Sequence, residues 1–323
     1  MTADEVAEKK KTGPKPLSAP RRIAVRIWAE AVEKKMRPVA RPDGHPPGRP
    51  ARLTPHELEK AAHSDTGRWH SETDGVRRPK QFDYLALGEH WPRRQTLNYF
   101  NRFCPEVAFW LHLDLWPLLE EESPSVAHLH QIMRLARENI RNLLFERADP
   151  ENPFNVSMRR CATPRHQIVP IVRAMGDVEA LTVLLALLRE AELEGDEESH
   201  MAVAEHVLNL TFALAVWPPW MDHAHEIFRQ LRKAVFPKFP TTMERLRVAQ
   251  INPDEEVSLL LNMSFSVKSA GLAAEDDPGS VIQQMLLLER LGRKQYFEYL
   301  CHNTKTGRVI DGRIGIITGY VED

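Results

Sequence analysis

The sequence predicts a mainly α-helical protein, with a basic module of short helices first, an irregular acidic helical bundle next, and a β-hairpin near the carboxyl end. Three observations predict this class. Apolar residues recur at helical spacing, prolines and glycines separate these segments, and a strong hairpin pattern occurs near residue 311. With 323 residues, 42% of them hydrophobic, the chain has enough material for one large or two medium domains.

Charge is unevenly distributed along the chain. Residues 1–100 contain 20 Lys and Arg against 13 Asp and Glu, whereas the remainder contains 23 against 32. The net charge of −2 therefore hides a basic front and an acidic body. This asymmetry is expected of a protein whose first part binds a polyanion.

The chain begins with a polar segment and continues into a first helix. Residues 1–20 are rich in lysine and predict a disordered basic arm, which either follows DNA phosphates or serves as a solubilising tail. Residues 23–35 predict an amphipathic helix with Trp28 on its apolar face. Six prolines in the segment from Met36 through Pro55 predict an extended basic loop after this helix.

Two further short helices follow in the basic module. Residues 53–62 predict a helix in which Thr54 is the N-cap, Pro55 is the first helical residue and Glu57 completes a capping box. Residues 63–78 are polar and glycine-containing, and predict a loop.

Residues 79–87 predict another helix, which Gly88 ends. Its apolar residues, Phe82 and Leu85, are expected to face inward. Pro92 suits the first turn of a following helix that runs from Arg93 through Phe103 to near Pro105. An aromatic and leucine-rich run then extends to residue 119.

This order of elements is a helix that Gly88 ends, followed by Pro92 four residues later and then by another helix. It resembles the corresponding part of the Cro/repressor-type (XRE) helix-turn-helix family. Phe82 and Leu85 match the apolar anchors of that family's recognition helix. The resemblance covers the first third of the chain, in pieces separated by two long insertions, residues 36–52 and 63–78. The layout is also similar to that of a group of uncharacterised bacterial proteins. The resemblance implies a DNA-binding, helix-turn-helix-like module over residues 21–119.

On this hypothesis, residues 79–87 form the recognition helix and the next helix begins at a DNA phosphate. Gln can pair with adenine, while Lys and Arg bind guanine or phosphate. The alternative is that these are ordinary solvated side chains of a small helical domain. The candidate DNA-binding residues are Arg77, Arg78, Lys80, Gln81, Tyr84, Arg93, Arg94 and Gln95.

Residues 124–323 predict the acidic helical domain. The segment 177–193 is unusually rich in leucine and predicts a central helix buried on most sides. Near the end, β-branched residues flank Asp311-Gly312 and predict a β-hairpin over residues 308–318. The other predicted helices are residues 126–147, 165–175, 197–216, 221–236, 253–268 and 281–301.

The sequence contains no recognised catalytic, nucleotide-binding or metal-binding motif. His223 and His225 are two residues apart on a predicted helix and point away from each other, so they do not form a chelating pair. The three widely separated cysteines are expected to be reduced thiols: Cys104, Cys161 and Cys301. We therefore expect a protein without enzymatic activity, metal or cofactor.

The expected function is that of a cytoplasmic bacterial transcription regulator that binds double-stranded DNA as a homodimer. We expect neither a signal peptide nor a membrane-spanning helix, because the first residues are polar and lysine-rich and the sequence contains no run of about eighteen uncharged apolar residues. A helical C-terminal domain would mediate dimerisation or bind a partner. The alternative is a protein-interaction or assembly subunit that does not bind DNA.

Overall fold

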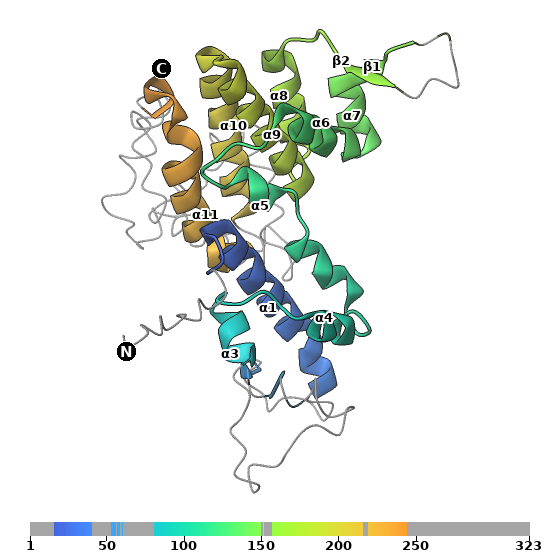
Figure 1. The fold of residues 1–323 in the computed structure, drawn as a ribbon, viewed down its shortest axis with the longest axis vertical. Helices are drawn as coiled ribbons and strands as arrows, with labels where there is room; N and C mark the ends of the chain where they lie inside the picture. Colours follow the sequence, from blue (N-terminus) through green and yellow to red (C-terminus); the bar gives the residue numbers. More distant parts are fainter. Residues whose placement is uncertain are drawn as a thin grey trace, which may run out of the picture. The chain divides into compact units, whose positions relative to one another are not determined.

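The computed structural model describes residues 16–40, 53–55, 57, 58, 60, 81–149, 151, 157–215 and 219–243 (Figure 1). These residues are mainly helical and include one two-stranded antiparallel sheet, which confirms the predicted mainly α class. The chain divides into two compact units, one ending at Leu111 and the other beginning at His112. We call them the first unit and the second unit.

The first unit is built around one long helix. Its elements are α1 (Ala19–Ala40), α3 (Gln81–Ala86), α4 (Arg94–Phe100) and the 3₁₀ helix η2 (Pro105–Leu111). Trp28 of α1 packs edge to face on Phe100, with ring centroids 5.9 Å apart, and Phe82 packs on the same ring at 5.6 Å. The apolar faces of α1, α3 and α4 thus share one core.

Helix α1 is longer than predicted. Residues 36–40 are helical, which corrects the prediction of extended backbone from Met36 onward. Met36 lies four residues after Val32 on the same helix face, and both side chains are buried in the core. Burial of this continuous face explains why the helix extends beyond the predicted end at Lys35.

The predicted capping box at Thr54 is confirmed. The Glu57 backbone N–H donates to Thr54 Oγ1 at 3.2 Å, and the Thr54 N–H donates to Glu57 Oε2 at 2.7 Å. Residues 55, 57, 58 and 60 are helical, and Leu58 is buried.

Gly88 terminates helix α3 as predicted, two residues after its last helical residue, Ala86. Gly88 has a φ of 69°, its N–H donates to the Leu85 carbonyl, and the Glu89 N–H donates to the Tyr84 carbonyl. This pair of hydrogen bonds is the Schellman motif.

Helix α4 is shorter than predicted. It starts at Arg94, with Arg93 as the N-cap, and ends at Phe100, after which residues 101–103 form a turn. Phe100 is fully buried, whereas Phe103 is 45% exposed and its ring centroid lies 5.1 Å from that of Tyr99.

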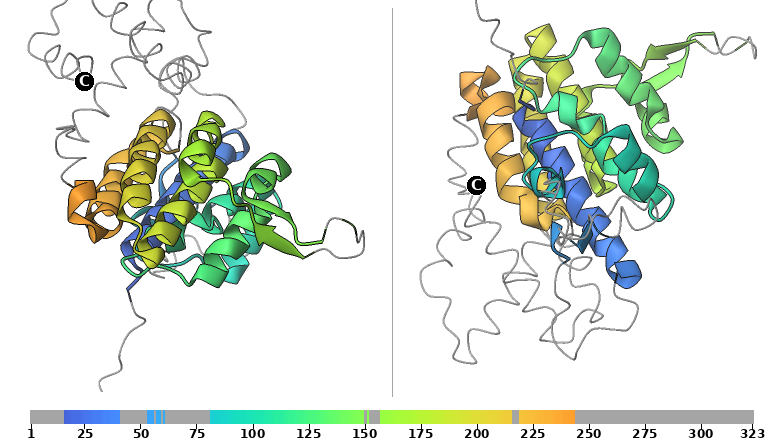
Figure 2. Two further views of the ribbon diagram at one scale, coloured as in Figure 1. Left: turned by 90° about the horizontal axis from the view of Figure 1, so that it is seen from above. Right: turned by 60° about the horizontal axis from the view of Figure 1, so that its bottom comes forward.

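The second unit surrounds α9 (Val178–Glu194). All residues from Ala180 to Ala191 are buried, because α9 packs against α5, α6, α8 and α10, which confirms the predicted central helix. α8, α9 and α10 run beside one another in every view (Figure 2). The other bounds are α5 (Leu115–Leu118), α6 (Val126–Leu135), α7 (Glu138–Leu144), α8 (Arg165–Ala174), α10 (Glu197–Leu214), η3 (Met221–His223), α11 (Ala224–Gln230), η4 (Leu231–Val235) and η5 (Phe236–Lys238).

The boundary between the units differs from the predicted one. We expected the basic module to extend to residue 119, whereas the second unit includes Leu115 and Leu118. Both side chains are buried in α5, which packs on α9, and the Leu118 carbonyl accepts a hydrogen bond from Arg189 Nε at 3.0 Å.

Two predicted long helices are divided into shorter pieces. The helix expected over residues 126–147 breaks at Ala136, where the backbone is extended, and its last residues form β1 (Phe145–Arg147). This strand pairs antiparallel with β2 (Met158–Arg160), an unpredicted sheet that projects from the helices (Figure 1). The helix expected over residues 221–236 is a succession of 3₁₀, α and π segments.

Several predictions lie outside the described residues. They include most of the arm at residues 1–20, the loop 63–78, the helices 253–268 and 281–301, Cys301 and the β-hairpin 308–318. Among the helices that the structure describes, none combines the length and apolar character needed to cross a membrane.

Candidate functional site

The predicted DNA-binding residues fall into three groups. Arg77, Arg78 and Lys80 lie outside the described residues. Gln81 is partly buried, and its Nε2–H donates to Thr96 Oγ1 at 2.6 Å. This corrects the expectation that Gln81 lies on the exposed side of the helix. The hydrogen bond instead joins the first residue of α3 to the first turn of α4.

The remaining predicted residues are exposed in the first unit. Tyr84 is 38% exposed on α3, and its ring meets that of His90 with centroids 5.0 Å apart. Arg93, Arg94 and Gln95 are exposed at the beginning of α4. Because Gln81 binds Thr96, the start of α4 lies beside the start of α3, and Tyr84 follows within one helical turn.

Helix α1 adds arginines that the sequence reasoning did not place in the site. A β-carbon on Gly88 would lie 2.5 Å from the Arg22 carbonyl oxygen and 3.0 Å from Arg26 Cγ, so the end of α3 touches the beginning of α1. Arg21 and Arg22 are exposed there. This contact depends on tertiary packing between segments more than 60 residues apart, which spacing in the sequence does not reveal.

Apolar side chains are exposed near the same arginines. Leu87 is 56% exposed at the end of α3, and Trp91 is 36% exposed between α3 and α4. Tyr84, Leu87 and Trp91 are large apolar groups within an eight-residue stretch. The surface therefore combines positive charge with apolar area.

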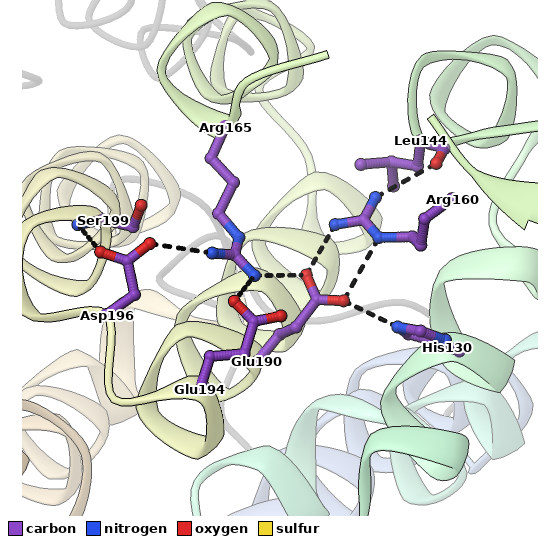
Figure 3. Close-up of polar contacts among 8 residues, drawn as sticks. All are labelled: His130, Leu144, Arg160, Arg165, Glu190, Glu194, Asp196 and Ser199. Carbon is purple, nitrogen blue, oxygen red and sulfur yellow. Dashed lines mark hydrogen bonds and ion pairs between the residues drawn. The ribbon is translucent and has the colours of Figure 1, made fainter. Parts of the chain in front are cut away.

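A second polar site is a cleft in the second unit with a volume of about 660 Å³. Its walls come from α6, the segment between β2 and α8, and helices α8, α9 and α10. At its base, a hydrogen-bonded network gathers side chains from these elements around Glu190 (Figure 3).

Glu190 is the centre of the network. Its side chain is only 3% exposed, and it accepts hydrogen bonds from Arg160 Nη2 at 2.6 Å and Arg165 Nη2 at 3.1 Å, and contacts His130 Nε2 at 2.7 Å (Figure 3). Burial alone would raise the pKa of Glu190, but the hydrogen bonds and charges of these partners lower it below its ordinary value. Glu190 is therefore ionised at neutral pH.

Arg165 connects Glu190 to the loop before α10. It contacts Glu194 at 2.5 Å and Asp196 at 3.2 Å, in addition to Glu190. Asp196 also caps α10 by accepting from the Ser199 N–H at 3.0 Å. Hydrogen bonding from the Ser199 side chain, followed by this backbone hydrogen bond, lowers the pKa of Asp196. Arg165 thus holds the carboxylates of Glu194 and Asp196, although both side chains are partly exposed.

The cleft does not have the character of a thiolate active site. Cys161 lines it, but burial raises the pKa of this thiol, and the charge of Glu146 raises it further. Catalytic cysteines require the opposite shift. Among the described residues, no group of three or more His, Cys, Asp or Glu is arranged to hold a metal ion.

The sequence reasoning missed this network, although one pattern pointed to it. Arg189 and Glu190 stand next to each other inside the leucine-rich segment 177–193, and buried charges require partners. The identity of those partners, such as Arg160 and His130, follows only from the fold. No protein-family model, curated protein or solved structure matches this chain.

Proposed function

We propose that this chain is a DNA-binding protein, acting as a transcription regulator, in which the first unit contacts double-stranded DNA. The observation that carries the proposal is the set of exposed arginines from two helices beside the short helix α3: Arg21 and Arg22 from α1, and Arg93 and Arg94 at the start of α4. The excess of basic residues over residues 1–100 supports it.

In this proposal the residues have different roles. The guanidinium groups of Arg93 and Arg94 bind phosphates and fix the position of the protein on the duplex. The exposed face of α3, with Tyr84, lies against the groove. Gln81 positions α3 through its hydrogen bond to Thr96, and does not pair with a base.

The second unit would join two copies into a cytoplasmic homodimer. A dimer would bind two half-sites, which raises the specificity that one small module provides. The proposed interface also includes the other predicted DNA-binding residues, Arg77, Arg78 and Lys80.

The experiment compares two double variants with equal loss of charge. We expect Arg93→Gln/Arg94→Gln to weaken binding to duplex DNA. The slope of the logarithm of the binding constant against the logarithm of the salt concentration should also become shallower by about 2, because each phosphate contact contributes about 0.9. Arg232→Gln/Lys233→Gln, an exposed pair in the second unit, should bind like the wild type. Fluorescence anisotropy across a salt series measures both. Equal losses in the two variants would contradict the proposed interface.

The alternative function is protein docking by the same unit without DNA. It is favoured by the exposure of Leu87 and Trp91 beside Tyr84, because large apolar side chains at a surface often mark protein contacts. Binding through apolar area depends weakly on salt, whereas DNA binding weakens steeply. Replacing Leu87 and Trp91 with Ser should abolish a docking interaction. The same change should leave phosphate-driven DNA binding largely intact.

A further inference from the structure

We infer that the cleft of the second unit binds a small organic polycation of the aliphatic amine class. This inference goes beyond the proposed function, because the cleft lies in the second unit and its occupancy can be measured without DNA. It rests on the shape of the cleft, its charge and the fixed geometry of its base.

Four helices, α6, α8, α9 and α10, each contribute residues to the lining of the cleft. Glu198, Ala202 and His206 are spaced at four residues along α10, so they form one stripe facing the cleft. Glu190 and Glu194 have the same spacing on α9. The volume of about 660 Å³ lies within the ordinary range for small-molecule sites.

The charges of the cleft select against anions. Its lining contains two arginines and four carboxylates, which leaves two negative charges in excess when the histidines are neutral. Both arginines are engaged, because Arg160 binds Glu190 and the Leu144 carbonyl, and Arg165 binds three carboxylates. A ligand entering the cleft therefore meets a negative electrostatic potential. This potential comes from the exposed carboxylate of Glu198 and the half-exposed carboxylates of Glu194 and Asp196.

Apolar wall residues favour an aliphatic cation over a hydrated metal ion. Val126 and Pro164, which are exposed, line the same cleft as the carboxylates. Methylene groups between two ammonium groups can pack on these side chains, while the ammonium groups meet carboxylates. Ser199 and Thr163 add hydroxyl groups that accept hydrogen bonds from an ammonium group.

The base of the cleft is fixed before a ligand arrives. The network around Glu190 ties α6, β2, α8 and α9 together through charge-assisted hydrogen bonds (Figure 3). A rigid site loses less conformational entropy on binding, and this raises affinity.

The test is isothermal titration calorimetry of the full chain with spermidine, in about 150 mM salt so that weak surface charge effects are screened. We expect saturable binding with one site per chain. Putrescine should bind more weakly because it has one ammonium group fewer. The neutral analogue 1,4-butanediol should not bind.

Two variants in the cleft and one outside it locate the site. Ala202→Lys places a positive charge on the face of α10 that lines the cleft, and lysine is a residue that helices readily accommodate. This variant should weaken spermidine binding at least about tenfold. Glu198→Gln, at an exposed position, should weaken it about threefold or more. Glu121→Gln removes an exposed carboxylate of the second unit that does not line the cleft, and this variant should bind spermidine like the wild type.

Several results would overturn the inference. They are absence of saturable heat at about 1 mM spermidine, unchanged affinity in Ala202→Lys, equal weakening in Glu121→Gln, and complete displacement of spermidine by an equal concentration of Mg²⁺. Retained helical circular dichroism in Glu198→Gln and Ala202→Lys is the control for folding. Failure of spermidine binding would leave the DNA-binding test in the first unit unaffected, so the two proposals fail separately.

Discussion

At the scale of single residues, Gly88 has two structural reasons to lack a side chain. Its φ of 69° lies in the left-handed region, and a β-carbon there would meet the Arg22 carbonyl oxygen at 2.5 Å. Gly195 shares the first property with a φ of 71°, but a β-carbon there would have no neighbour within 4 Å. Comparing alanine substitutions at Gly88 and Gly195 therefore separates the free-energy cost of a left-handed backbone conformation from the cost of a steric clash.

We expect Gly88→Ala to lower the free energy of unfolding by about 2 to 4 kcal/mol, from strain in the backbone and overpacking against α1. Gly195→Ala should cost only about 1 to 2 kcal/mol, from strain alone. Urea unfolding followed by circular dichroism measures both losses. Equal losses would show that the contact between α3 and α1 is not tight.

His200 should make stability depend on pH. It is fully buried, its Nδ1 lies 2.9 Å from Thr242 Oγ1, and its ring packs on Phe239. Burial lowers the pKa of His200 from 6.5 to about 4; the charge of Glu192 opposes this shift and that of Arg189 adds to it. Between these two pKa values the unfolded chain binds a proton that the folded chain does not. The contribution of His200 is therefore complete above pH 6.5 and declines as the pH falls.

At pH 4.5 this contribution should have fallen by about 2.5 kcal/mol. His200→Gln should remove that part of the pH dependence, while His128→Gln, at an exposed position, should keep it. Urea unfolding at pH 7 and pH 4.5 gives the comparison. A His200→Gln protein with the pH dependence of the wild type would show that His200 is not buried in its neutral form.

At the scale of helices, Glu190 connects α9 to its neighbours. Glu190→Gln removes the charge that Arg160 and Arg165 share in a buried position, and should lower the free energy of unfolding by about 3 kcal/mol. Glu194→Gln removes a half-exposed partner of Arg165, and should cost about 1 kcal/mol or less. Thermal and urea unfolding provide the measurement. An unchanged free energy of unfolding in Glu190→Gln would mean that the network does not stabilise the second unit.

The helices also show which elements the sequence could predict. α8, α9 and α10 begin and end within two residues of their predicted bounds, because their apolar periodicity is long and Asp177 supplies an N-cap that accepts from the Ala180 N–H. β1 and β2 were missed because each has only three residues, too few for a periodic pattern. The break at Ala136 was missed because no proline or glycine marks it.

At the scale of the whole molecule, the chain pairs a basic unit with an acidic one. The sequence predicted the charge asymmetry and the exposed Tyr84, Arg93, Arg94 and Gln95, since these depend on composition and local periodicity. It did not predict the approach of Arg22 to Gly88 or the cleft around Glu190. Both are built from residues far apart in the chain, whose meeting depends on how helices pack.

The central claim is that the first unit binds DNA. The most direct test is fluorescence anisotropy of the full chain with a random-sequence duplex and with the DNA upstream of its own gene, from low to physiological salt. We predict binding to both duplexes with a steep negative salt slope and tighter binding to the upstream duplex. Absence of binding at low salt would contradict the claim and favour the protein-docking alternative.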